Sequence, residues 1–159
     1  MDLKHLDILF TSTRFNLFKP STWLTYLIQY FSKSKTNHVL ILVDIYGELF
    51  IAEANGKEVD LFPFYKRKDL LFRVYRLPTA EVNLQKIFSL QKEKYDKKSI
   101  LRHFLFIVFH KWFGKDKKNS YNCVEFISEV FGFKGKDYAT ITPATLEQDL
   151  KEYFVYGNY

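Results

Sequence analysis

The sequence contains a single cysteine, Cys123, among its 159 residues. A disulfide within the chain is therefore excluded, and cysteine usage gives no sign of an oxidising compartment. Without a second cysteine or a compact cluster of His, Asp and Glu, the sequence predicts no metal site. We expect a protein that works without a metal or another cofactor.

No hydrophobic run is long enough to cross a membrane. The fully apolar run at residues 104–109 is far shorter than the roughly 20 residues that span a bilayer. Residues 1–7 lack the basic-then-apolar order and the small-residue cleavage site of a secretory signal. Internal repeats, low-complexity tracts and linkers are also absent. We therefore expect one soluble, cytoplasmic domain over residues 1–159.

The chain is rich in positive charge and in aromatic residues. A net charge of +6 favours an anionic partner, such as nucleic acid, a membrane or cell-wall surface, or an acidic substrate. The basic residues form short clusters, for example at residues 66–68 and 115–118, which we interpret as solvated surface. They are not interleaved with aromatic residues on one strand face, which argues against nucleic acid. The aromatic share of 19% predicts a thick core or an apolar groove.

The order of the predicted elements indicates an α+β fold. Apolar and β-branched runs bounded by turn residues predict an N-terminal antiparallel meander or barrel. Amphipathic and apolar patterns predict helices that dominate the second half. Strands followed by helices are typical of the α+β class. The predicted strands cover residues 6–13, 38–45, 48–54, 57–62 and 70–77, and the predicted helices cover 21–31, 79–94, 98–113, a segment starting at Cys123, and 143–153.

Cys123 lies where a polar loop gives way to a helical pattern. Cys123, Phe126, Ile127 and Val130 recur at the spacing of a buried helix face. Ser120 or Asn122 could cap this helix, which would place the thiol in its first turn. The partial positive charge of a helix N-terminus stabilises a thiolate, and its unpaired N–H groups could hold an oxyanion. The alternative is that this lone cysteine is a small buried hydrophobic residue.

His38 and Glu53 supply a candidate base and acid for the same site. If Tyr46-Gly47 is a two-residue hairpin turn, opposed residues have numbers that sum to 93, so His38 faces Asn55. Glu53 then lies diagonal to His38 on the same face, at roughly 7–8 Å between backbones. A buried carboxylate needs a partner, and it would orient the ring and favour its charged form. Solvation of His38, or pairing of Glu53 with a lysine, is the structural alternative.

The other three histidines fit a catalytic role less well. His5 precedes the first strand in a mobile terminus. His103 and His110 share one face of a predicted helix that is rich in phenylalanine, which indicates packing. We therefore place Cys123 as nucleophile, His38 as base, and Glu53 or Asn55 as the orienting group.

Six short motifs follow one another over about residues 5–155: Leu6-Asp7-Ile8-Leu9, Asn37-His38-Val39-Leu40-Ile41, Ile51-Ala52-Glu53-Ala54, Lys94-Tyr95-Asp96, Tyr121-Asn122-Cys123-Val124-Glu125-Phe126 and Thr142-Pro143-Ala144. With these motifs in this order, the chain as a whole resembles the circularly permuted papain-like hydrolases of the NlpC-like and YiiX-like group. In that family the histidine strand and its acidic partner precede the cysteine helix. The resemblance implies the same triad, and it implies that Tyr95 lines the site, with Tyr121, Asn122 and Asn55 as further substrate-binding candidates.

These observations lead to alternative functions from different classes. The first is a cysteine hydrolase that cleaves a peptide amide, such as a peptidoglycan stem peptide, through a thioester acyl-enzyme. The second uses the same triad on lipid acyl groups or thioesters, by hydrolysis or acyl transfer. The third is a non-catalytic basic module that binds nucleic acid or a membrane surface, with Cys123 in its core. The oligomeric state is left open.

Overall fold

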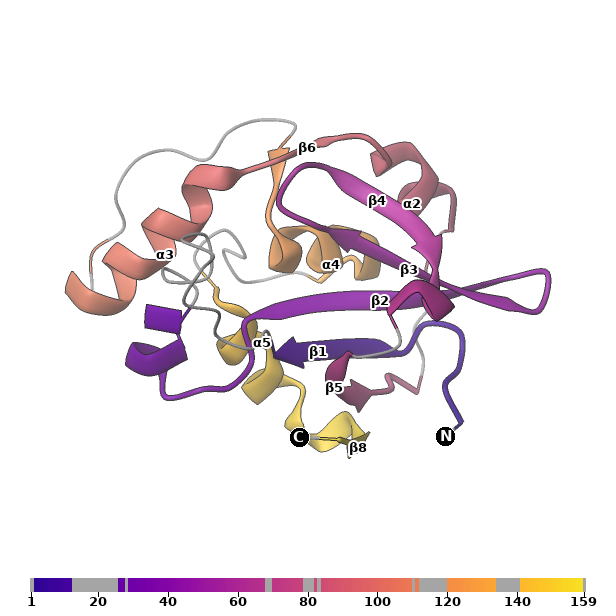
Figure 1. Cartoon of the computed structure of the whole chain (residues 1–159), viewed down its shortest axis with the longest axis horizontal. Coiled ribbons are helices and arrows are strands. Elements are labelled where there is room, and N and C mark those ends of the chain that lie inside the picture. Colours follow the sequence, from indigo (N-terminus) through magenta and orange to yellow (C-terminus); the bar gives the residue numbers. More distant parts are fainter. Residues whose placement is uncertain are drawn as a thin grey trace.

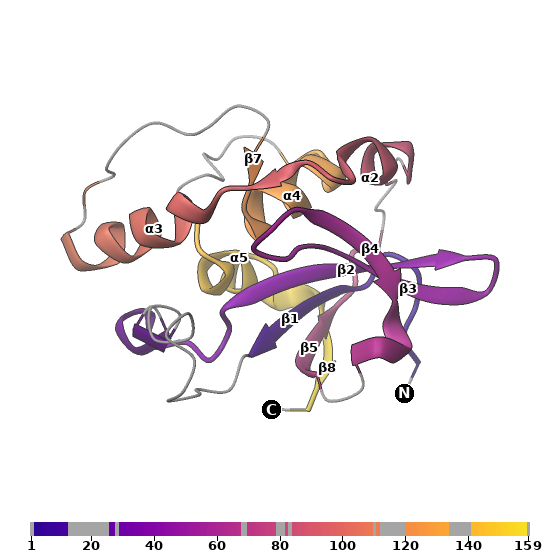
Figure 2. The ribbon, with the colours of Figure 1, turned by 45° about the horizontal axis from the view of Figure 1, so that its top comes forward.

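The computed structural model describes residues 2–12, 26–27, 29–67, 70–78, 82, 84–109, 111, 120–133 and 141–158. The larger of its two sheets has six strands in the order β4-β3-β2-β1-β5-β8, and every neighbouring pair is antiparallel. Figures 1 and 2 show β1 and β2 across the middle of this sheet. The strands are β1 (Ile8–Ser12), β2 (His38–Ile45), β3 (Glu48–Ala54), β4 (Val59–Pro63), β5 (Leu71–Tyr75) and β8 (Phe154–Gly157).

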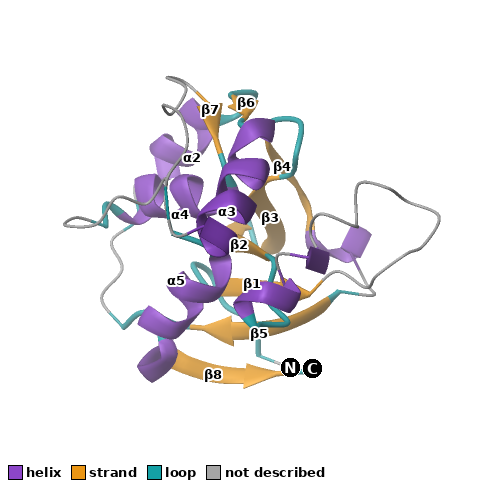
Figure 3. Ribbon diagram, turned by 90° about the vertical axis from the view of Figure 1, so that its left-hand side faces the viewer, coloured by secondary structure: helices purple, strands orange, loops and turns teal. Residues whose placement is uncertain are grey.

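Alternating residues of the sheet build two separate apolar clusters. On β1, Ile8 and Phe10 belong to the cluster that also holds the buried face of the cysteine helix, whereas Leu9 belongs to the other. Side chains alternate between faces along a strand, so each buried strand contributes to both clusters. Figure 3 shows helices α3, α4 and α5 gathered along one side of the sheet. The sheet is therefore buried on both faces, which explains the almost unbroken apolar runs of β1 and β2.

The helices follow the sequence pattern closely where it was strongest. Residues 26–27 and 29–32 are helical, where the sequence predicts a helix over 21–31, and residues 21–25 and 28 lie outside the described ranges. The next predicted helix ends early, at Leu90, because Lys92 adopts a φ of 71° and its N–H bonds to Val59. Residues 110 and 112–113 of the third lie outside the described part. The named helices are α2 (Leu84–Leu90), α3 (Lys97–Phe109), α4 (Cys123–Phe131) and α5 (Pro143–Asp149), and the 3-10 turns are η1 (Phe64–Arg67) and η2 (Lys151–Tyr153).

The last predicted helix is shorter than expected, and a strand follows it. Thr142 caps α5 and Pro143 is its first residue, as the sequence predicts. The helix gives way to η2, and β8 then adds a sixth strand beside β5. The sequence did not predict β8.

Two features of the topology also differ from a simple meander. Strands β1 to β4 are consecutive neighbours, but β5 returns to pair with β1 rather than with β4. A second, two-stranded sheet pairs β6 (Lys94–Tyr95) with β7 (Ser120–Tyr121) in parallel. The α+β class with an antiparallel sheet is confirmed. Within the described ranges, no helix combines the length and the apolar character needed to cross a lipid bilayer.

Candidate active site

Cys123 is the first residue of α4, and Asn122 caps that helix. The backbone of Asn122 is extended, and its Oδ1 accepts hydrogen bonds from the N–H groups of Val124 at 2.8 Å and Glu125 at 2.9 Å. In return, Glu125 Oε2 accepts from the Asn122 N–H at 2.7 Å, which completes a capping box. Of the two caps that the sequence allows, the structure uses Asn122 and not Ser120. The thiol consequently lies at the positive end of the helix dipole.

His38 is the first residue of β2, and its ring contacts the Glu53 carboxylate of β3. The distance between His38 Nε2 and Glu53 Oε2 is 2.7 Å. Ile45 pairs with Glu48, so the β2–β3 turn has the two residues that the predicted register requires. Glu53 is only 1% exposed, and its side chain reaches the ring diagonally across the strand pair. The expected contact between the candidate base and its acid is present in the structure.

Arg67 is the second partner of Glu53, and the sequence analysis missed it. Its Nη2 lies 2.6 Å from Glu53 Oε1, and its guanidinium also lies 5.6 Å from the centre of the Phe62 ring. We interpreted the basic cluster at residues 66–68 as solvated surface, which is wrong for Arg67. The 3-10 turn η1 directs this side chain back over β3. Neither residue spacing nor composition predicts that turn. Both carboxylate oxygens of Glu53 are thus paired with cationic or ionisable groups.

The electrostatics favour a charged His38 ring. Burial opposes the charged form, but the charge of Cys123 and a hydrogen bond to it, followed by smaller contributions from Glu53, raise the pKa of His38 to about 10. Burial also opposes the charged form of Glu53, which by itself raises the pKa of that carboxyl group. The hydrogen bond to His38 and the charges of His38 and Arg67 outweigh burial, so the pKa of Glu53 is lowered. A raised histidine pKa beside a lowered glutamate pKa describes an imidazolium paired with a carboxylate.

Cys123 and His38 meet at the ends of their elements, each being a first residue. Helix α4 packs against β2 and β3, and the Cys123 side chain lies close enough to the His38 ring to act on it through charge and a hydrogen bond. Cys123 is 6% exposed, so the sulfur is largely covered. The His38 side chain retains 22% exposure, which leaves the ring as the solvent-facing member of the pair. The sulfur is thus buried, as the structural alternative requires, but it faces the imidazole.

The hydrogen bonds of the Asn55 side-chain oxygen go to the turn after β3. Asn55 is exposed, and its Oδ1 accepts from the backbone N–H groups of Lys57 and Glu58. This hydrogen bonding stabilises the turn after β3, where Gly56 has a φ of 89°. The Asn55 side chain thus serves the turn. The hydrogen bond that the structure gives to the His38 ring is with the Glu53 carboxylate.

The remaining predicted site residues lie around the start of α4. Tyr95 and Tyr121 pair with each other across β6 and β7, and both pack as half-buried rings against the core cluster that contains Cys123. Beside its capping Oδ1, Asn122 has a buried Nδ2 without a hydrogen-bond partner among the described residues. Asp96 is buried and paired with Arg102, an ion pair that the sequence analysis did not anticipate.

The other histidines lie outside this arrangement or outside the described side chains. His5 Nδ1 accepts a hydrogen bond from the Asp44 N–H at 2.9 Å, at the far end of β2 from His38. The side chain of His103 and all of His110 lie outside the described residues.

Comparison with known proteins adds no assignment. No protein-family model matches the chain, and no curated protein matches it significantly in sequence. The functional argument consequently depends on the geometry of Cys123, His38 and Glu53.

Proposed function

We propose that this protein is a cysteine hydrolase of amide bonds with a circularly permuted papain-like arrangement. Cys123 is the nucleophile, His38 the general acid and base, and Glu53 the group that orients the ring. The single observation that carries the proposal is the position of His38, whose Nε2 bonds to a buried carboxylate while the ring also interacts with the only thiol of the chain. This is the nucleophile, base and orienter set that acyl transfer requires.

The reaction would proceed through two acyl-transfer steps. The Cys123 sulfur attacks the amide carbonyl carbon, and the C–N bond breaks as His38 donates a proton to the leaving amine. This forms a thioester on Cys123 and leaves His38 neutral. His38 then takes a proton from water, the resulting hydroxide attacks the thioester, and the acid product leaves as the thiolate and imidazolium are restored.

Two further parts of the structure support these steps. The N-terminus of α4 presents backbone N–H groups and a positive dipole end, which suit the oxyanion formed at the carbonyl oxygen. The bond from Glu53 to His38 Nε2 leaves Nδ1 for proton exchange with the sulfur and the leaving group. Arg67 in turn neutralises the other oxygen of Glu53, which keeps this buried carboxylate ionised.

The proposal is tested by trapping the acyl-enzyme. Wild type and Cys123→Ala are incubated with a mixed library of peptide, isopeptide and acyl-lipid substrates, and products and intact protein masses are recorded. We expect turnover and a mass increase on wild type only, with His38→Ala slower by about 10²–10⁴-fold and His5→Ala unchanged. Turnover that survives in Cys123→Ala would refute the mechanism. The substrates consumed decide between peptide amides and lipid acyl groups.

The burial of Cys123, at 6% exposure, favours one second candidate, a non-catalytic basic binding module. On that hypothesis Cys123 is a core residue, and the net charge of +6 attracts an anionic surface. Binding to anionic vesicles would then fall steeply with salt, and Cys123→Ala would bind like wild type. Binding that is unchanged between low and high salt would remove this candidate.

A further inference from the structure

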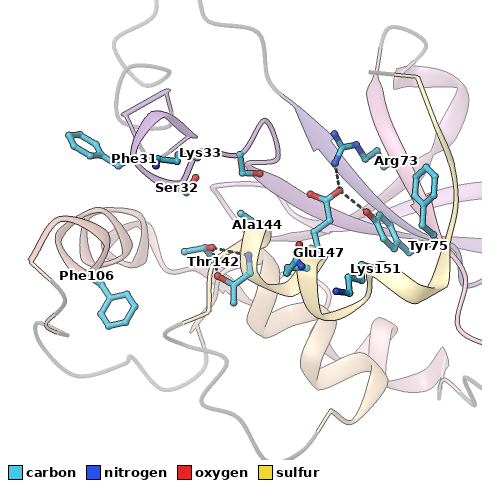
Figure 4. A pocket seen from close by; sticks show the side chains of 14 residues that line it. Phe31, Ser32, Lys33, Arg73, Tyr75, Phe106, Thr142, Ala144, Glu147 and Lys151 are labelled. Carbon is cyan, nitrogen blue, oxygen red and sulfur yellow. Dashed lines mark hydrogen bonds and ion pairs between the residues drawn. The ribbon is translucent and has the colours of Figure 1, made fainter.

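A pocket of about 910 Å³ lies beside α5, and none of Cys123, His38 and Glu53 lines it. Its walls come from residues 31–34, α3, β5, α5, η2 and β8. Figure 4 shows Phe31 and Phe106 toward one end, and Arg73 with Tyr75 toward the other, with Glu147 between Arg73 and Tyr75. The volume falls in the range of about 300–1,000 Å³ that small-molecule sites occupy.

At the polar end, a buried carboxylate is fully engaged by protein donors. Glu147 Oε1 accepts from the Tyr75 hydroxyl at 2.9 Å and from Arg73 Nη1 at 3.1 Å. Glu147 Oε2 accepts from the Thr36 hydroxyl. The charges of Glu147 and Arg73 therefore compensate each other. Because both carboxylate oxygens already accept hydrogen bonds from the protein, Glu147 is not a free ligand-binding group.

Two lysines give the pocket an excess of positive charge. Lys33 and Lys151 both line it and are exposed, and within the described part of the chain neither ammonium group has an ion pair. The lining contains three cationic side chains and one carboxylate, so its net charge is +2. Figure 4 shows Lys151 toward the end that holds Tyr75 and Glu147, and Lys33 beside Phe31. Uncompensated cations in a concave site attract an anion more strongly than the same charges on a convex surface.

The other end is aromatic. The Phe31 ring packs edge-to-face on Phe104 of α3, with ring centroids 6.0 Å apart, yet Phe31 is still 47% exposed. Phe106 lines the same end of the pocket (Figure 4). The exposed Phe31 ring and the half-buried Phe106 ring present apolar surface that a ligand chain would cover.

We propose that this pocket binds an amphiphilic anion, with a single alkyl or acyl chain against Phe31 and Phe106 and an anionic headgroup on Lys151. Lys33 adds to the positive field, and a compact ammonium group suits a phosphate or a carboxylate. The proposal does not involve Cys123 chemistry, so it stands or falls independently of the hydrolase.

The test is calorimetric titration of the full chain with dodecyl phosphate below its critical micelle concentration. We expect saturable binding of one molecule, weakened at least tenfold in Lys151→Glu and at least fivefold in Phe31→Ala. The matched controls are Lys57→Glu, on the exposed turn after β3, and Phe88→Ala, on α2, whose ring is also 47% exposed. Both controls should bind within twofold of wild type, and circular dichroism confirms that each variant is folded.

Three further titrants separate the contributions of chain and headgroup. Dodecanoate should bind more weakly than dodecyl phosphate if the site takes a phosphate lipid, and more tightly if it takes a fatty acid; either result supports an amphiphilic anion. Dodecyl maltoside binding as tightly as both anions would overturn the proposal, as would inorganic phosphate binding as tightly as dodecyl phosphate. Equal losses in the pocket variants and the control variants would also overturn it.

Discussion

The contact between Glu53 and His38 makes a sharp prediction for Glu53→Gln. Glutamine has the same shape, but it replaces a carboxylate by one acceptor and one donor group. The Glu53 oxygens lie 2.7 Å from His38 Nε2 and 2.6 Å from Arg67 Nη2. In Glu53→Gln the side-chain NH₂ group must therefore face one of these two donors. The substitution therefore leaves a buried cation without its counter-charge.

The expected magnitude follows from the burial of each partner. Removing one member of a buried ion pair costs about 3–5 kcal/mol. Arg67 is 42% exposed and can be rehydrated, so its share is about 1 kcal/mol or less. The His38 ring, at 22% exposure, accounts for most of the loss. We expect Glu53→Gln to lower the free energy of unfolding by about 3 kcal/mol at pH 7.

Urea denaturation at several pH values measures this difference. The pKa of Glu53 is lowered by folding, so its stabilising contribution is present above its ordinary value of 4.5 and is lost as pH falls through the lower folded value. The difference between wild type and Glu53→Gln should therefore shrink in acid. The control is Glu48→Gln, at the exposed start of β3. A loss below about 0.5 kcal/mol at pH 7, equal to that of an ordinary surface substitution, would refute the reasoning.

Three other substitutions test neighbouring parts of the account. Because folding raises the pKa of His38 to about 10, its stabilising contribution is complete below pH 6.5 and is lost as pH rises toward 10; His38→Ala should flatten this part of the stability profile in urea denaturation. Glu147→Ala removes the acceptor of three hydrogen bonds and should cost about 2–4 kcal/mol by thermal unfolding, against no significant change for the exposed Glu152→Ala. Asn122→Ala removes the cap of α4 and should cost about 1 kcal/mol, largely restored by Asn122→Asp.

Local signals in the sequence were sufficient for the hairpin that carries His38 and Glu53. Its two strands are continuous apolar runs, and the two-residue turn fixes their register, so the diagonal contact followed from counting residues. The start of α4 was equally local, because an asparagine followed three residues later by glutamate is a capping signature.

The parts that the sequence did not reveal depend on contacts between distant segments. Strand β8 is only four residues long, too short for periodicity to separate it from the preceding helical segment, and it pairs with β5 at the edge of the sheet. The four-stranded meander has two edges, β1 and β4, and β5 pairs with β1. Local sequence does not distinguish these two pairings. Arg67 reaches Glu53 because the 3-10 turn follows β4. In the sequence it is one of three consecutive basic residues, a pattern that is typical of solvated surface. Long-range pairings of this kind leave little trace in local periodicity.

The rate of Cys123 alkylation as a function of pH tests the central claim most directly. With iodoacetamide as probe, a thiolate held by an imidazolium reacts well below pH 7, whereas an ordinary thiol gains reactivity only near pH 8.5. We predict a reactive shoulder below pH 7 in wild type that is lost in His38→Ala and retained in His5→Ala. A single ordinary ionisation in all three proteins would contradict the account.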